Sequence, residues 1–532
     1  APKSCENHPH ETALTQNKIR GILHDLQIPE SNPVAVAWLR LAGTDNHYGL
    51  AIRAHRYALS SRPIDGDFCQ FWNELQGILD VVLDKFETSY LAVYRFLDQL
   101  LAIPEPIQGD IDKLKNNVSN NLVAHGYFFE RLTSSGWLDL LQVNGFFSHP
   151  PAPEVDNEKG TIGYSSWPQS RYLVRMAPLA PEKVVNIMLA VPPTDNVRVY
   201  EDFASAATVM PPELAAKWSD QETLRVNKPE GLLGLLPEKL SALMNHLFQG
   251  GQVTAALGLA GALLEVLPDL RPENEKQDKD EYSLSLEPCA RFSAGRYKRI
   301  LERMIPILSP LARFPAFDLF CDLLEKAITL SKTSTDDEPG PEDYSYIWQH
   351  HLEDRPRGDD IKNILVHGAR EVVGAIVMQD PTQLLTLVEK LEKRRYEIFR
   401  RIALDLLRRY PDTGVSLIAA RLTDRCLFDA HGTQHEYELL AQEWFSKLEA
   451  KDQEKILSWI EAGPGDDDVY KQWHKERSSQ EPSVEEIVQH KKRWQRNHLA
   501  PLHKSLSADW KQRYEELIGE VRKPKGDVTE NS

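Results

Sequence analysis

The spacing of apolar residues predicts helices along most of the chain, because these residues recur at intervals of three and four. The pattern is densest at 252–267. Apolar side chains there occupy both sides of the predicted helix: Val253, Leu257, Ala260, Leu264 and Leu267 on one, and Leu259, Leu263 and Val266 on the other. Such a helix must be covered by neighbouring helices. Small residues such as Gly258 and Gly261 would let those neighbours approach closely, as in stacked helix hairpins.

A second helical segment, 232–249, precedes this one and is joined to it by Gly250 and Gly251, which predicts a helix hairpin. Further helical segments continue towards the C-terminus: 291–312, 317–331, 361–378, 382–409, 413–422, 437–448 and 453–460. Strand signals are confined to 160–164 and 197–200. We therefore predict an all-α fold, an irregular helical-repeat (α-solenoid-like) array of antiparallel helix pairs.

Breaks in composition suggest how the chain is divided. Residues 144–170 contain four prolines and three glycines with little periodicity, which predicts a long surface loop. Residues 269–283 are strongly charged and predict a solvated linker. These breaks separate an N-terminal helical domain at 1–143, short helices with a repeat-like hairpin at 171–268, and a C-terminal helical-repeat domain at 284–532.

Composition narrows the class of protein and its location. The chain has 532 residues and a formal net charge of −17, which repels nucleic acids and anionic lipids except at a local basic patch. Its five cysteines are odd in number and widely scattered, which is typical of reduced thiols in a cytosolic protein. No segment reaches the roughly 18 to 20 uninterrupted apolar residues needed to cross a bilayer. We therefore expect a cytoplasmic protein with no membrane partner.

Arg493 and His498 are separated by four residues on a predicted helix that opens with the capping box Ser483 and Glu486. This spacing resembles the R-x4-6-H motif of HEPN-type ribonucleases, which cleave an RNA phosphodiester without a metal. The resemblance implies catalytic roles for the arginine and the histidine. Trp494 departs from the family's pattern, in which a polar residue usually follows the arginine.

Two basic segments are candidates for contact with an anionic partner. The first is 490–496, which contributes Lys491, Lys492, Arg493, Trp494 and Arg496. The second is 393–410, where Arg394 and Arg401 are heptad-spaced on one stripe. Acidic residues four positions before several of its basic residues can compensate this charge within the helix. A solvated, salt-bridged face is therefore the competing interpretation, and the first segment is the better candidate.

His431 and His435 have the four-residue interval that places two imidazoles on one helix face. A closed metal site needs about four protein ligands and an open one about three, and the sequence identifies no third. Because Gly432 interrupts the pattern, we expect the histidines at the N-terminal end of a helix. We predict no metal and no cofactor.

The hairpin at 243–267 is similar to tetratricopeptide- and HEAT-type repeats in its rhythm of leucine, paired glycine, alanine and terminal Leu-Pro. The segments 137–147 and 348–354 resemble helical-repeat regions of large bacterial proteins associated with antiphage defence. These resemblances imply a scaffold or sensor subunit. We therefore expect a non-catalytic protein that binds a macromolecule, most of all another protein. A ribonuclease and a nucleic-acid-binding module at 490–496 stay open as alternatives.

Overall fold

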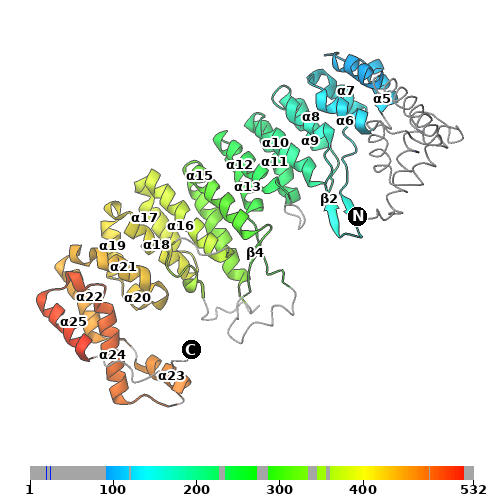
Figure 1. Ribbon diagram of the computed structural model, residues 1–532. Helices are drawn as coiled ribbons and strands as arrows, with labels where there is room; N and C mark the ends of the chain where they lie inside the picture. Colours follow the sequence, from blue (N-terminus) through cyan, green and yellow to red (C-terminus); the bar gives the residue numbers. More distant parts are fainter. Residues whose placement is uncertain are drawn as a thin grey trace, which may run out of the picture. The chain divides into compact units, whose positions relative to one another are not determined.

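The computed structural model describes residues 20, 24, 92–118, 122–226, 234–271, 286–332, 344–354, 360–465, 467–478 and 480–520. This part of the chain is mostly helical, with two short two-stranded sheets (Figure 1). The predicted all-α class is therefore confirmed. The chain divides into two compact units: Ala1–Pro150 with Trp167–Ile187, and Pro151–Ser166 with Met188–Ser532.

The described part of unit 1 is a helical cluster built around aromatic side chains. Its helices include α5 (Gln108–Val118), α6 (Leu122–Arg131), α7 (Leu138–Val143) and α8 (Pro168–Met176). Phe128, Trp137 and Tyr172 are fully buried between them. The indole Nε1 of Trp137 donates a hydrogen bond to the carbonyl of Ile103 at 2.8 Å, so this ring keeps its one polar group satisfied inside the core.

The first half of unit 2 consists of helices that pack mainly on helices one or two places away along the chain. The helix α9 (Pro181–Ala190) leads into it, and the others are α10 (Val197–Thr208), α11 (Pro212–Val226), α12 (Leu236–Gln249), α13 (Val253–Leu263), α15 (Ala294–Leu330) and α16 (Ile361–Gln379). The main contacts join α10 with α12, α11 with α13, α12 with α13 and α15, and α15 with α16. The predicted hairpin of α12 and α13 is confirmed, and its turn residue Gly251 has a positive φ of 76°.

The prediction for 252–267 is wrong in two respects. The helix α13 ends at Leu263, and the strand β3 (Val266–Leu267) then pairs with β4 (Cys289–Ala290). Burial is also one-sided, because Gly258 is exposed while Leu259 and Leu263 are buried. The helices α11, α12 and α15 cover that buried side. The apolar composition of 252–267 therefore predicted a helix that is buried on all sides, whereas α13 is buried on one side.

The element α15 covers the two segments that were predicted as separate helices, and a kink between them divides it into two helices as predicted. Its backbone departs from helical geometry at Arg313 (φ 40°, ψ −111°), between Pro310 and Pro315, and these prolines account for the kink. Among the described helices, α15 is the one that is long and apolar enough to cross a membrane. Half of its most apolar window is buried, and α16 packs along it.

The second half of unit 2 contains shorter helices: α17 (Leu384–Glu392), α18 (Glu397–Arg409), α19 (Val415–Leu422), α20 (Arg425–Asp429), α21 (Gln434–Trp444), α22 (Ala450–Ala462), α23 (Asp467–Ser478), α24 (Val484–Leu499) and α25 (Ala508–Glu520). The single helix predicted over 382–409 is therefore two helices. The second of them, α18, is the central one, since every residue from 398 to 407 except Arg400 is buried. It packs against α16, α17 and α21.

The predicted loops and strands are corrected in part. Within 144–170, the strand β1 (Glu154–Asp156) pairs antiparallel with β2 (Thr161–Gly163), so this segment contains a small hairpin. The other strand candidate, 197–200, forms the first turn of α10. Most of the predicted linker at 269–283 lies outside the described residues.

Candidate functional site

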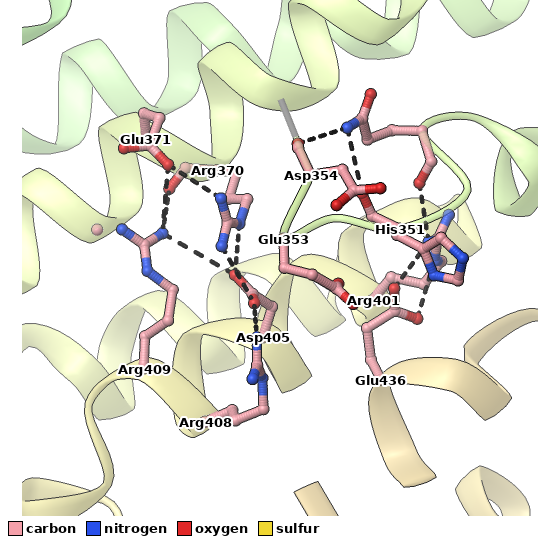
Figure 2. A network of polar contacts seen from close by, with 12 residues as sticks. His351, Glu353, Asp354, Arg370, Glu371, Arg401, Asp405, Arg408, Arg409 and Glu436 are labelled. Carbon is pink, nitrogen blue, oxygen red and sulfur yellow. Dashed lines mark hydrogen bonds and ion pairs between the residues drawn. The ribbon is translucent and has the colours of Figure 1, made fainter. Parts of the chain in front are cut away.

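The most deeply buried basic side chain in the described part of the chain is Arg401 on α18 (Figure 2). Its side chain is 2% exposed, as is that of Glu436 on α21. The guanidinium donates two hydrogen bonds to this carboxylate, from Nε to Oε2 at 2.9 Å and from Nη2 to Oε1 at 2.7 Å. This bidentate pairing offsets the cost of removing both charges from water.

The remaining donors of Arg401 hold a separate stretch of backbone. This stretch begins with the short helix η2 (Tyr344–Ile347) and continues to residue 354. Four of its carbonyls accept hydrogen bonds from the guanidinium: Tyr346 at 2.6 Å, Trp348 at 2.8 Å, His350 at 3.0 Å and Gln349 at 3.1 Å. One side chain therefore fixes the segment 344–354 against α18 and α21.

Gln349 gives the same segment a second constraint. Its φ is 48°, a left-handed conformation that costs a residue with a side chain about 1–3 kcal/mol. The buried side-chain amide donates to the carbonyls of His351 at 3.2 Å and Asp354 at 2.7 Å, and the backbone N–H donates to Asn363 on α16 at 2.8 Å. These bonds hold a strained turn in the segment that carries His351 and Glu353.

His351 and Glu353 project from this turn towards His435, which lies next to Glu436 on α21. The distance from Nδ1 of His351 to Nε2 of His435 is 3.0 Å, and that from Nε2 of His435 to Oε1 of Glu353 is also 3.0 Å. All three atoms lie within 4.8 Å of one another. The side chains of His435 and Glu353 are 34% and 35% exposed, so solvent reaches the cluster.

The carboxyl group of Glu353 is held in its ionised form. Burial raises its pKa, but hydrogen bonds from its own backbone N–H and from His435, together with the charge of Arg408, lower the pKa below its ordinary value. The cluster therefore combines two imidazoles with one carboxylate, a set of donors that divalent transition metals prefer.

A second polar network lies one turn further along α18 (Figure 2). Asp405 is 2% exposed and accepts a hydrogen bond from Nε of Arg370 on α16 at 2.7 Å. Two arginines of its own helix also approach it, Arg408 at 3.4 Å and Arg409 at 3.9 Å. Glu371 adds a further negative charge, 3.6 Å from Arg409. This network joins α16 to α18 beside the segment held by Arg401.

The stripe of Arg394 and Arg401 does not form a solvated surface. Arg401 is in the interior, so its assignment as a surface binding residue is wrong: its five donors are used by Glu436 and by backbone carbonyls. Arg394 is 18% exposed and pairs with three carboxylates of α15: Asp318 at 3.1 Å, Asp322 at 2.6 Å and Glu325 at 3.3 Å. The carboxylates that compensate these arginines therefore come from other helices rather than from four positions earlier.

The basic cluster 490–496 lies on α24. Arg493 is exposed, whereas Lys491, Lys492, Trp494 and Arg496 are half-buried. The indole of Trp494 stacks on the imidazole of His498 with ring centroids 3.9 Å apart, and Arg496 donates to the side chain of Asn497 at 3.0 Å. Several members of this cluster therefore contribute to local packing.

The structure does not bring Arg493 and His498 together within the chain. Five residues along a helix correspond to a rotation of about 140°, so the two side chains leave α24 in different directions. Arg493 is exposed, while His498 is half-buried against Trp494 and Phe428. The Nδ1 of His498 donates to the carbonyl of Trp494 at 2.9 Å.

Burial lowers the pKa of His498 below its ordinary value. The unfolded chain therefore binds a proton at this residue at a higher pH than the folded chain does, and stability is lost as the pH falls through the ordinary range of histidine, about 6.5. We expect the free energy of unfolding, measured by urea denaturation, to fall between about pH 7.5 and 5.5, and to fall less in His498→Phe. An equal loss in the variant would contradict this assignment.

The predicted pair of His431 and His435 is separated in the structure. His431 opens the short helix η5 (His431–Thr433), and α21 begins after it at Gln434, which confirms that the histidines lie at the start of a helix. The neighbours of His435 instead come from positions 84 and 82 residues earlier in the chain. The available sequence signal was the run His350, His351, Leu352, Glu353, which has metal-ligand types but no helical spacing.

No family model, curated protein or solved structure matches this chain. The resemblances to tetratricopeptide and HEAT repeats, to HEPN ribonucleases and to defence-associated proteins therefore stay predictions. Function has to be inferred from the geometry described above.

Proposed function

We propose that the protein is a helical-repeat scaffold that binds another protein. Support for a repeat-type architecture comes from unit 2, where the main packing partners of each described helix from α10 to α21 lie within three helix numbers of it along the chain. Stacked helices of this kind create a large surface whose side chains can vary without disturbing the core. Binding through such a surface needs no catalytic group.

The observation that carries this proposal is the exposed apolar surface of η2. Tyr346 and Ile347 are 38% and 57% exposed, although the backbone carbonyl of Tyr346 is bound to Arg401. An aromatic and an aliphatic side chain on a fixed backbone lose little conformational entropy on binding, and such residues are common at the energetic centres of protein interfaces. We call Tyr346 and Ile347 the η2 surface.

Charge also favours a protein partner. The net charge of −17 repels nucleic acids, and the basic cluster on α24 is partly used in packing. A nucleic-acid-binding module and a ribonuclease therefore have less support than a protein scaffold. A cytoplasmic location and a place in bacterial antiphage defence remain predictions that follow from the sequence.

We expect the double variant Tyr346→Ser, Ile347→Ser to lose binding of the partner that the wild-type chain captures from a lysate of its native host. The reason is the loss of two exposed apolar contacts from the η2 surface, for which we expect at least a tenfold weaker dissociation constant, or about 1.4 kcal/mol. The measurement is affinity purification with mass spectrometry, followed by titration calorimetry with the purified partner.

The matched control is Leu179→Ser, which removes an exposed apolar side chain from unit 1. This variant should retain the partner. Equal capture by the double variant and the wild type would contradict the η2 surface as the binding site. Steep loss of binding with salt, or dependence on Arg493, would instead support a nucleic-acid partner.

A further inference from the structure

We propose that His351, Glu353 and His435 bind a divalent transition-metal ion, for which Zn²⁺ is the best match, with a fourth position open to solvent. The proposal is independent of the η2 surface. It assigns a role to a cluster that the scaffold function does not use, and it differs from the sequence-based expectation that the chain holds no metal.

The spacing of the three donor atoms suits one ion. Ligands about 2.0–2.1 Å from a tetrahedral Zn²⁺ lie roughly 3.3 Å from one another. Two of the three separations here are 3.0 Å, and all are within 4.8 Å. Small side-chain rotations are therefore sufficient to direct all three donors to a common centre.

Hydrogen bonding alone satisfies this arrangement poorly. Nε2 of His435 lies 3.0 Å from both a carboxylate oxygen of Glu353 and Nδ1 of His351. This nitrogen can carry one proton or one lone pair. If Nε2 of His435 carries a proton and donates it to Glu353, then Nδ1 of His351 is either a second acceptor that competes for this proton or a second donor that faces it. If Nε2 carries a lone pair, the lone pair faces the carboxylate oxygen of Glu353, which is itself an acceptor. A cation between the three atoms turns all three lone pairs into ligands.

The surrounding structure holds the ligands before any ion binds. Arg401 fixes the carbonyls of residues 346 and 348–350 on one side and Glu436, next to His435, on the other. The buried amide of Gln349 then holds the turn between His351 and Asp354. Such preorganisation by surrounding hydrogen bonds is typical of metal centres. Two ligands come from one segment and the third from a helix more than eighty residues later, so the ion would join them.

The donor set and exposure indicate the kind of site. Two imidazoles and one carboxylate are the ligands of open zinc sites, in which water or another ligand occupies the fourth position. The exposure of His435 and Glu353, about one third each, leaves room for that fourth ligand. Calcium and magnesium prefer all-oxygen sites and match this cluster less well.

The test uses the full chain after treatment with a chelator and dialysis. We expect titration calorimetry with Zn²⁺ to show one tight site per chain, and Co²⁺ to give the visible absorption of a four-coordinate ion. His435→Ala and His351→Ala should each weaken Zn²⁺ binding by about 100-fold or more, because each removes a ligand. Glu353→Gln, which preserves size, should reduce affinity and change the Co²⁺ spectrum while leaving the circular dichroism unchanged.

The matched control is His431→Ala, which removes the histidine at the sequence spacing that first suggested a metal site. It should bind Zn²⁺ with wild-type affinity. The proposal is overturned if the wild type takes up no stoichiometric Zn²⁺, if the conservative Glu353→Gln variant binds as tightly as the wild type with an unchanged Co²⁺ spectrum, or if His431→Ala is the variant that loses binding.

Discussion

Replacing Arg401 by methionine is expected to lower the free energy of unfolding by about 3–5 kcal/mol. The substitution leaves the buried carboxylate of Glu436 without its counter-charge. It also removes the hydrogen-bond donors of four backbone carbonyls in the segment 344–354. Unsatisfied buried groups of this kind are among the most destabilising changes in a protein interior. Urea denaturation followed by circular dichroism measures the effect.

Arg400→Met is the matched control, because it removes the neighbouring arginine of α18, which is only half-buried. Its effect should be within about 0.5 kcal/mol. Adding Glu436→Leu to Arg401→Met should recover part of the loss, since the second change removes the uncompensated charge. Strictly additive effects of the two substitutions would show that the pair does not act as described.

Asp405→Ala is expected to be the second most damaging substitution, with a loss of about 3 kcal/mol. Arg370, Arg408 and Arg409 all approach this buried carboxylate, so its removal leaves three guanidinium groups with only the more exposed carboxylates of Glu371 and Glu443. Because repulsion between partly exposed charges is screened by salt, the loss should be smaller at high ionic strength. Urea denaturation at two salt concentrations measures both effects.

Asp412→Ala serves as the comparison, since Asp412 is an exposed aspartate that lies just after α18. Its substitution should change stability by less than about 0.5 kcal/mol. If the two aspartate variants had the same free energy of unfolding, the network around Asp405 would make no net contribution to stability.

The sequence predicted the helical class and many helices, because apolar spacing depends on local structure. The hairpin of α12 and α13 illustrates this, since paired glycines and flanking apolar segments specify it within a few turns. The end of α13 was missed because β3 pairs with a strand more than twenty residues later. A local pattern carries no information about that partner.

The charged positions of α18 show why the site was harder to predict. Arginines at heptad spacing are most often solvated, and a carboxylate four residues away normally compensates them. The charge of Arg401 is instead paired with Glu436, 35 residues later. Its other donors bind backbone carbonyls of a segment about 50 residues earlier. The metal-ligand cluster depends on the same long-range packing. Both features depend on contacts between segments that are far apart in the chain, and a single sequence does not show which distant segments meet.

The buried guanidinium of Arg401 also affects how the protein opens. The segment 344–354 cannot leave α18 without exposing four carbonyls and releasing a charge pair. Local opening of this segment is therefore coupled to unfolding of α18 and α21, and these parts form one cooperative block. A ligand that binds the segment thus stabilises helices that it never touches.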